Sequence, residues 1–152
     1  MEHVSDFAHR RIWYARWEGA EGFDAPEGGR EPWTCLLIGP PGGLPEFMMD
    51  RVAARLIETN ARNIVIYADD ADDWHESIDA AYLEHDPAVS EDEFVMTAQF
   101  DEEPIDEAIF FFLMCADFDE IRFRQFAVLE IGDNPALRKD IVHSVQSLRF
   151  LD

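Results

Sequence analysis

The sequence WTCLLIGPPGG, at residues 33–43, is the clearest structural signal in the chain. Its first six residues form a continuous apolar run that ends at glycine and proline, which is typical of a strand covered on both faces. From Pro45 to Ile57, apolar side chains recur at spacings of three and four residues, and this pattern predicts an amphipathic helix. The segment therefore predicts a strand, a tight turn and a helix.

The same unit recurs to the end of the chain. Further strands are predicted at residues 64–67, 94–100 and 126–131, with residues 60–63 as a break before the first of them. Helices are predicted at residues 72–83, 104–116 and 134–148. This alternation indicates right-handed βαβ crossovers, so the predicted fold is α/β: a Rossmann-like three-layer sandwich with a mostly parallel sheet of four to five strands and four helices.

The length of 152 residues predicts one α/β domain, residues 1–152. Residues 1–32 supply an N-terminal strand, at residues 10–17, and an irregular surface loop rich in glycine and proline, while residues 33–152 form the repeating core. Cys35 and Cys115 are expected as small core residues, because neither has another cysteine at motif spacing. No apolar segment reaches the roughly 18 residues that span a bilayer, and the expected location is the cytoplasm.

The charge balance is strongly acidic, with 33 Asp and Glu residues against 12 Lys and Arg residues and a formal net charge of -21. Nucleic acids and membrane surfaces are dense in negative charge, so direct binding to either is not expected. A basic protein is the partner that such a field favours. The alternative interpretation is that the excess acid only keeps the chain soluble.

Many of these acids follow predicted strands. In a parallel sheet, the segments after the strands meet at one edge, which is where ligands of such folds bind. The predicted partner-binding residues are Asp69, Asp70, Asp72, Asp73, Trp74, Asp101, Glu102 and Glu103.

The same edge suggests an alternative magnesium site. Mg²⁺ prefers oxygen ligands and would suit phosphoryl transfer or phosphodiester cleavage. Its predicted ligands are Asp69, Asp70, Asp101 and Asp133. Against this alternative, the loops after the strands contain no Lys or Arg, and residues 39–43 lack the spacing of a phosphate-binding loop. We therefore expect no catalytic residue and no cofactor.

Three segments carry a resemblance to a known family: YADDADDWH at residues 67–75, FVMTA at 94–98 and DEEPIDEA at 101–108. Together they resemble an uncharacterised family of small acidic bacterial α/β domains of unknown function. The resemblance covers residues 33–131 and implies the fold, with no catalytic residue to transfer.

The sequence leads to three hypotheses. The first is an acidic protein-binding module of the immunity or inhibitor type, which neutralises a basic partner. The second is a metal-dependent Rossmann-like enzyme or nucleotide-binding protein with a carboxylate site at the strand ends. The third is a homo-oligomeric structural module that uses the apolar residues 110–114 as its interface.

Overall fold

The computed structural model of the chain describes residues 1–7, 9–17, 22–85, 95–114, 123–132 and 135–148. Within these ranges, one sheet contains the strands β1 (Glu2–Phe7), β2 (Arg10–Trp17), β3 (Trp33–Ile38), β4 (Ala61–Tyr67), β5 (Met96–Phe100) and β6 (Gln125–Ile131). The helices are α1 (Glu46–Glu58), α2 (Ala71–His85), α3 (Ile105–Met114) and α4 (Pro135–Leu148).

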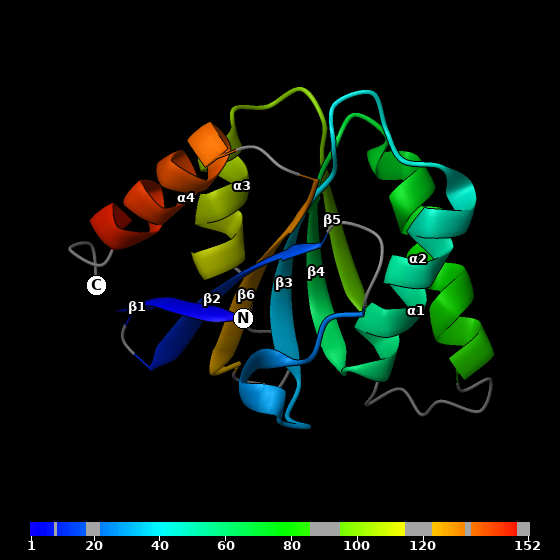
Figure 1. The fold of residues 1–152 in the computed structure, drawn as a ribbon, viewed down its shortest axis with the longest axis horizontal. Helices are drawn as coiled ribbons and strands as arrows, with labels where there is room; N and C mark the ends of the chain where they lie inside the picture. Colours follow the sequence, from blue (N-terminus) through cyan, green and yellow to red (C-terminus); the bar gives the residue numbers. More distant parts are fainter. Residues whose placement is uncertain (8, 18–21, 86–94, 115–122, 133–134, 149–152) are drawn as a thin grey trace.

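The strand order is β1-β2-β6-β3-β4-β5 (Figure 1). Every neighbouring pair is parallel except β1 with β2, which is antiparallel. The predictions of a mostly parallel α/β sheet and of four helices are confirmed. The predicted number of four to five strands was wrong, because the described residues form six.

The additional strand is β1, which lies at the edge of the sheet and pairs only with β2. Its residues Glu2, His3 and Asp6 are exposed, and Ser5 is the buried one among the side chains of this strand that the structure describes. An edge strand is held by main-chain hydrogen bonds on one side, so it needs no apolar run. Because this segment is mostly polar, the sequence pattern did not predict that it forms a strand.

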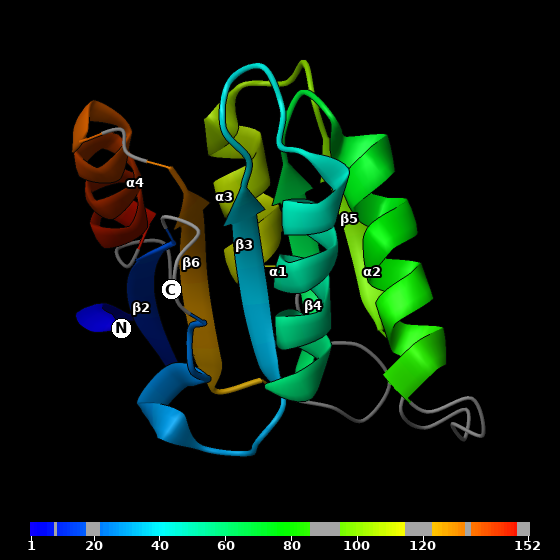
Figure 2. The same ribbon diagram turned by 45° about the vertical axis from the view of Figure 1, so that its right-hand side comes forward.

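The helices cover both faces of the sheet (Figures 1 and 2). Cys35 and Leu37 of β3 belong to the hydrophobic cluster that includes α1 and α2, whereas Leu36 and Ile38 belong to the cluster that includes α3 and α4. Side chains alternate between the two faces of a strand, so β3 is buried along its whole length. This is the physical reason for the unbroken apolar run.

Most boundaries lie within one or two residues of the predicted ones, and two segments differ more. β4 begins at Ala61, three residues before the apolar run, because the buried Asn63 belongs to the strand. The loop before β3 is also more ordered than predicted: it contains a short 3-10 turn at Pro26–Gly28 and buries Phe23 and Ala25. Composition alone gave no sign of this packing.

Two further predictions concern the cysteines and the membrane. Cys35 is a buried free thiol, as predicted, and Cys115 lies outside the described residues. None of the helices in the described ranges combines the length and the apolar composition needed to span a bilayer.

Candidate functional site

The carboxyl ends of β3, β4, β5 and β6 meet at one edge of the sheet, because these strands are parallel neighbours. β3 leads to α1 on one face, whereas β6 leads to α4 on the other face. Such a reversal of direction leaves a crevice between the two strand ends, where ligands of open α/β sheets bind. A pocket of about 280 Å³ lies there, and we call it the switch-point pocket.

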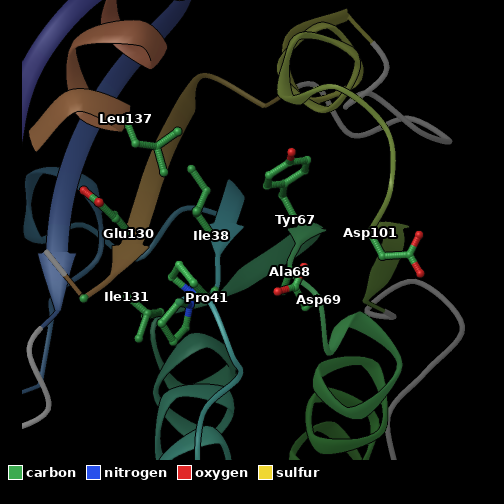
Figure 3. A pocket seen from close by; sticks show the side chains of 12 residues that line it. Ile38, Pro41, Tyr67, Ala68, Asp69, Asp101, Glu130, Ile131 and Leu137 are labelled. Carbon is green, nitrogen blue, oxygen red and sulfur yellow. The ribbon is translucent and has the colours of Figure 1, made fainter. Parts of the chain in front are cut away.

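The four strand ends surround this pocket (Figure 3). Glu130 of β6 lies on one side, Ile38 of β3 lies in the middle, and Tyr67 of β4 lies on the other side with Asp69 and Asp101. Two prolines and two aliphatic residues add to the lining: Pro40, Pro41, Ile131 and Leu137. The pocket therefore combines an apolar surface with three carboxylates.

Glu130 is the buried carboxylate of the pocket, with 2% of its surface exposed. Its Oε2 accepts a hydrogen bond from the phenol of Tyr14, which is itself buried. The guanidinium of Arg138 lies over the Tyr14 ring, 5.2 Å from its centroid, and forms an ion pair with Glu2. Burial, followed by the hydrogen bond to Glu130, raises the pKa of Tyr14 well above its usual range, so the phenol stays protonated and keeps donating.

Tyr67 and Glu103 shape the turn between β5 and α3. The Tyr67 hydroxyl donates to the backbone carbonyl of Glu103 at 3.2 Å. The Glu103 carboxylate accepts hydrogen bonds from the backbone N–H groups of Asp101 and Glu102, at 3.0 and 3.2 Å. Although Glu103 is a predicted partner-binding residue, its carboxylate already has a role within this turn.

Asp70 holds the loop after β3. Its Oδ2 accepts a hydrogen bond from the backbone N–H of Leu44 at 3.1 Å. A Cβ at Gly43 would lie 3.0 Å from the same oxygen, and Gly43 has a φ of +85°, so glycine is required there. The N–H of Gly43 donates to the carbonyl of Pro40, which confirms the predicted tight turn. The Asp70 carboxylate, a predicted partner-binding group, thus stabilises a loop of its own chain.

The remaining acids at this edge are exposed. We define the acidic edge as Asp69, Asp72, Asp73, Asp101 and Glu102. Within the described part of the chain, none of these five carboxylates has an ion-pair partner. The structure therefore brings together five of the eight predicted partner-binding residues as free surface charge.

Acids elsewhere are paired with arginine. Arg11 pairs with Glu27, and Arg124 pairs with Glu31 at 3.0 Å. Arg11 lies at the beginning of β2, and Arg124 lies directly before β6. Among the described residues, the starting edge of the sheet thus carries both signs of charge, whereas the five residues of the acidic edge carry one.

Trp74, a predicted partner-binding residue, lies in the core. Its exposed fraction is 0%, and it packs in the same cluster as Ile78, one helical turn further along α2. Residues four apart share a helix face, and this face of α2 is turned to the sheet. The indole therefore offers no surface to a partner.

The predicted magnesium ligands are not assembled by the described residues. No three His, Cys, Asp or Glu side chains in those ranges come together as ligands for a metal ion. Asp70 already binds the loop after β3, and Asp133 lies outside the described residues. The magnesium alternative thus stays a prediction.

A second hollow lies between α1 and α2, with a volume of about 600 Å³. Four carboxylates line it: Glu46 and Asp50 of α1, and Asp73 and Glu76 of α2. The Ser77 hydroxyl donates to Asp50 across it, at 2.8 Å. This acidic groove shares Asp73 with the acidic edge. It did not emerge from the sequence, because it depends on how the two helices pair.

The stretch at residues 110–114 is divided between core and surface. Phe112 and Leu113 are fully buried, whereas 49% of Phe110 and 41% of Met114 are exposed. The buried side chains of this stretch pack in the core. The exposed side chains of Phe110 and Met114 are the ones that an oligomer interface could use.

Of the residues that line the switch-point pocket, only Asp69 and Asp101 were predicted as site residues, and those missed include Tyr67, Glu130 and Leu137. One signal was present for Glu130, which is the one acid in the apolar run at residues 126–131. A charged residue inside a buried strand has to find a partner, and it marks a site more often than an exposed acid does.

No curated protein matches the chain in a sequence comparison. A family model does match, over residues 12–147, which extends beyond the region of the predicted resemblance at both ends. The predicted membership of an uncharacterised family is confirmed. The chain belongs to the family described as a domain of unknown function, DUF7684.

Proposed function

We propose that this protein is an acidic protein-binding module, of the immunity or inhibitor type, which binds a basic partner through the acidic edge and the adjoining acidic groove. One observation supports it above the others: five exposed carboxylates at one edge of the sheet lack an ion-pair partner among the described residues, while arginines neutralise acids at the opposite edge. The proposal also includes a Rossmann-like three-layer arrangement of the domain, which presents the strand ends as one surface.

Unpaired carboxylates that lie close together repel one another and destabilise the folded state. The same charges attract a basic surface, raise the rate of association and discriminate against acidic partners. The net charge of -21 adds a long-range attraction for basic proteins, and it repels the phosphate backbone of nucleic acids. When a basic protein binds, its positive charges neutralise these carboxylates. The relief of their repulsion then contributes to the free energy of binding.

The test is an affinity capture from lysate of the native host at low salt. The variant Asp72→Lys/Asp73→Lys reverses two charges at the first turn of α2. The matched control, Glu84→Lys/Asp140→Lys, makes the same change in net charge at two exposed residues away from the acidic edge. We expect one basic protein to be captured by the wild type and by the control, and lost with the edge variant.

The captured protein is then purified, and its association rate is measured against ionic strength. We expect the edge variant to associate about tenfold more slowly and with a weaker dependence on salt. Circular dichroism verifies that the variant is folded, since losing the helix-dipole interaction of each aspartate costs only about 0.3–1 kcal/mol. Equal rates for edge variant and control would refute the acidic edge as the binding surface.

A metal-dependent enzyme or nucleotide-binding protein is the second candidate, because the switch-point pocket lies where such folds bind nucleotides. Its described lining contains Asp69, Asp101 and Glu130 but no Lys or Arg to receive a phosphate. Calorimetry with Mg²⁺, alone and with a nucleotide, tests it. Stoichiometric binding that is lost in Asp69→Asn would favour this candidate over the first.

A further inference from the structure

We propose that the switch-point pocket binds an arginine side chain, supplied by the basic partner as an anchor inserted among the exposed charges. This inference rests on the proposed function and deepens it. It assigns to the pocket a ligand class, the alkyl guanidinium, and a place in the interface next to the acidic edge.

The size of the pocket favours a single side chain. Its volume is about 280 Å³. Sites for cofactors and drug-sized ligands range from roughly 300 to 1,000 Å³, so this pocket lies at the lower end of that range. A long side chain that enters from a neighbouring protein needs less room than a nucleotide does.

The lining matches the two parts of an arginine side chain. Ile38, Ile131 and Leu137 offer an aliphatic surface to the methylene groups, which arginine commonly buries while its charged end reaches polar groups. Tyr67 adds an aromatic ring, with which a guanidinium can interact through its face.

The charges of the pocket select a cation. Asp69, Asp101 and Glu130 contribute carboxylates, and the described residues that line the pocket include no Lys or Arg. Asp69 and Asp101 also have no ion-pair partner in the described ranges, so a guanidinium can pair with them without displacing another cation. Arginine is favoured over lysine, because its planar guanidinium is weakly hydrated and forms paired hydrogen bonds with carboxylates.

The fold prepares this pocket before any ligand arrives. The Tyr14 phenol fixes the carboxylate of Glu130, and the Tyr67 hydroxyl is held by the Glu103 carbonyl. Asp70 holds the loop that carries Pro40 and Pro41. Fixed walls reduce the ordering required on binding, which is a feature of sites where a single side chain contributes strongly.

The test uses Nα-acetyl-L-arginine N-methylamide as the probe, titrated into the isotope-labelled protein and followed by nuclear magnetic resonance. The matched probe is the citrulline analogue, which has nearly the same shape without the charge. We expect saturable shifts of the backbone amides of Gly39, Ala68 and Gly132, which line the pocket, and no shift at the distant Gly29. The citrulline probe should bind at least about tenfold more weakly.

Two variants locate the binding. Asp69→Asn should weaken the arginine probe roughly threefold to fivefold, and Leu137→Trp, which fills the pocket, should abolish the shifts while circular dichroism reports a folded protein. The matched control is Asp72→Asn, which neutralises the acidic edge outside the pocket and should leave the affinity unchanged.

The outcomes separate this inference from the proposed function. Equal binding of the two probes, or equal loss in Asp69→Asn and Asp72→Asn, would overturn the arginine site while a captured basic partner still supported the acidic edge. Conversely, arginine binding that is lost in Leu137→Trp would support the pocket even if no basic partner were captured, and the proposed function alone would fall.

Discussion

The phenol of Tyr14 on β2 donates a hydrogen bond to the buried carboxylate of Glu130 on β6, across 116 positions of sequence. The two strands are parallel neighbours, and Tyr14 pairs with Val128, two residues before Glu130. Residues two apart point to the same face of a strand, so the tyrosine reaches forward to the carboxylate. This hydrogen bond from β2 therefore fixes the side chain of Glu130, which forms one wall of the switch-point pocket.

Tyr14→Phe should lower the free energy of unfolding by about 1–3 kcal/mol, because a buried carboxylate loses a hydrogen-bond donor. Tyr67→Phe is the matched control, since its half-buried hydroxyl bonds a neutral carbonyl, and it should cost about 0.5–1.5 kcal/mol. Urea denaturation measures both. A smaller loss for Tyr14→Phe than for Tyr67→Phe would contradict the importance of this bond.

Stability should fall as the pH rises above about 10, where a tyrosine in the unfolded chain loses its proton. The pKa of Tyr14 is raised in the folded state, so the folded protein keeps a proton that the unfolded chain releases, and alkaline pH favours unfolding. Urea denaturation between pH 8 and 11 should show a shallower decline for Tyr14→Phe than for the wild type. Parallel declines would count against the raised pKa.

Cys35 should not react with Ellman's reagent in the folded protein. The thiol is fully buried, and burial raises its pKa, so almost no thiolate forms near neutral pH. A Cys115→Ser background restricts the measurement to Cys35. Labelling should become complete in 8 M urea, and rapid labelling without denaturant would show that the core around β3 opens easily.

Gly39→Ala should destabilise the protein by about 1–3 kcal/mol, because overpacking forces a shift of the backbone. A Cβ at this position would lie 2.7 Å from the Cβ of Ala68 and 3.2 Å from Nε1 of Trp74. Gly29→Ala is the control, since its backbone is extended and its Cβ would meet nothing closer than 3.7 Å. Thermal unfolding compares the two, and equal melting temperatures would rule out the close approach of the strand ends.

Neutralising the acidic edge should stabilise the protein in low salt. Asp69→Asn/Asp101→Asn removes two unpaired carboxylates, and we expect a gain of a few tenths to about 1 kcal/mol. Glu27→Gln/Glu31→Gln removes two carboxylates that pair with arginine, and it should give no gain. The difference should disappear in 1 M NaCl, because salt screens exposed charges. A gain for both variants would mean that only the net charge matters.

The sequence predicted the elements with clear periodicity and missed those that depend on pairing. The apolar run at β3 and the spacing in α1 each carry their own signal, because burial requires apolar residues at every position that faces the core. β1 carries no such signal, since its polar side chains lie at an edge.

The strand order could not be read from the sequence, and the switch-point pocket depends on it. β6 follows β5 in the chain but lies between β2 and β3 in the sheet. This placement brings Glu130 opposite Asp69 and Asp101 around one pocket. The acids after β4 and β5 lie at one edge of the sheet, as predicted, because parallel strands end at the same edge whatever their order.

Along the strands of the described part of the chain, unpaired acids lie at one end and acids paired with arginine lie at the other, so this part has a charge asymmetry like that of an electric dipole. Among the residues that the structure describes, the acidic edge is the more negative end, while Arg11 and Arg124 lie at the other end of the sheet. A dipole in the field of a charged body experiences a torque as well as a force. An approaching basic protein would therefore rotate this molecule to face it before the surfaces touch, and fewer collisions would be spent in the wrong orientation.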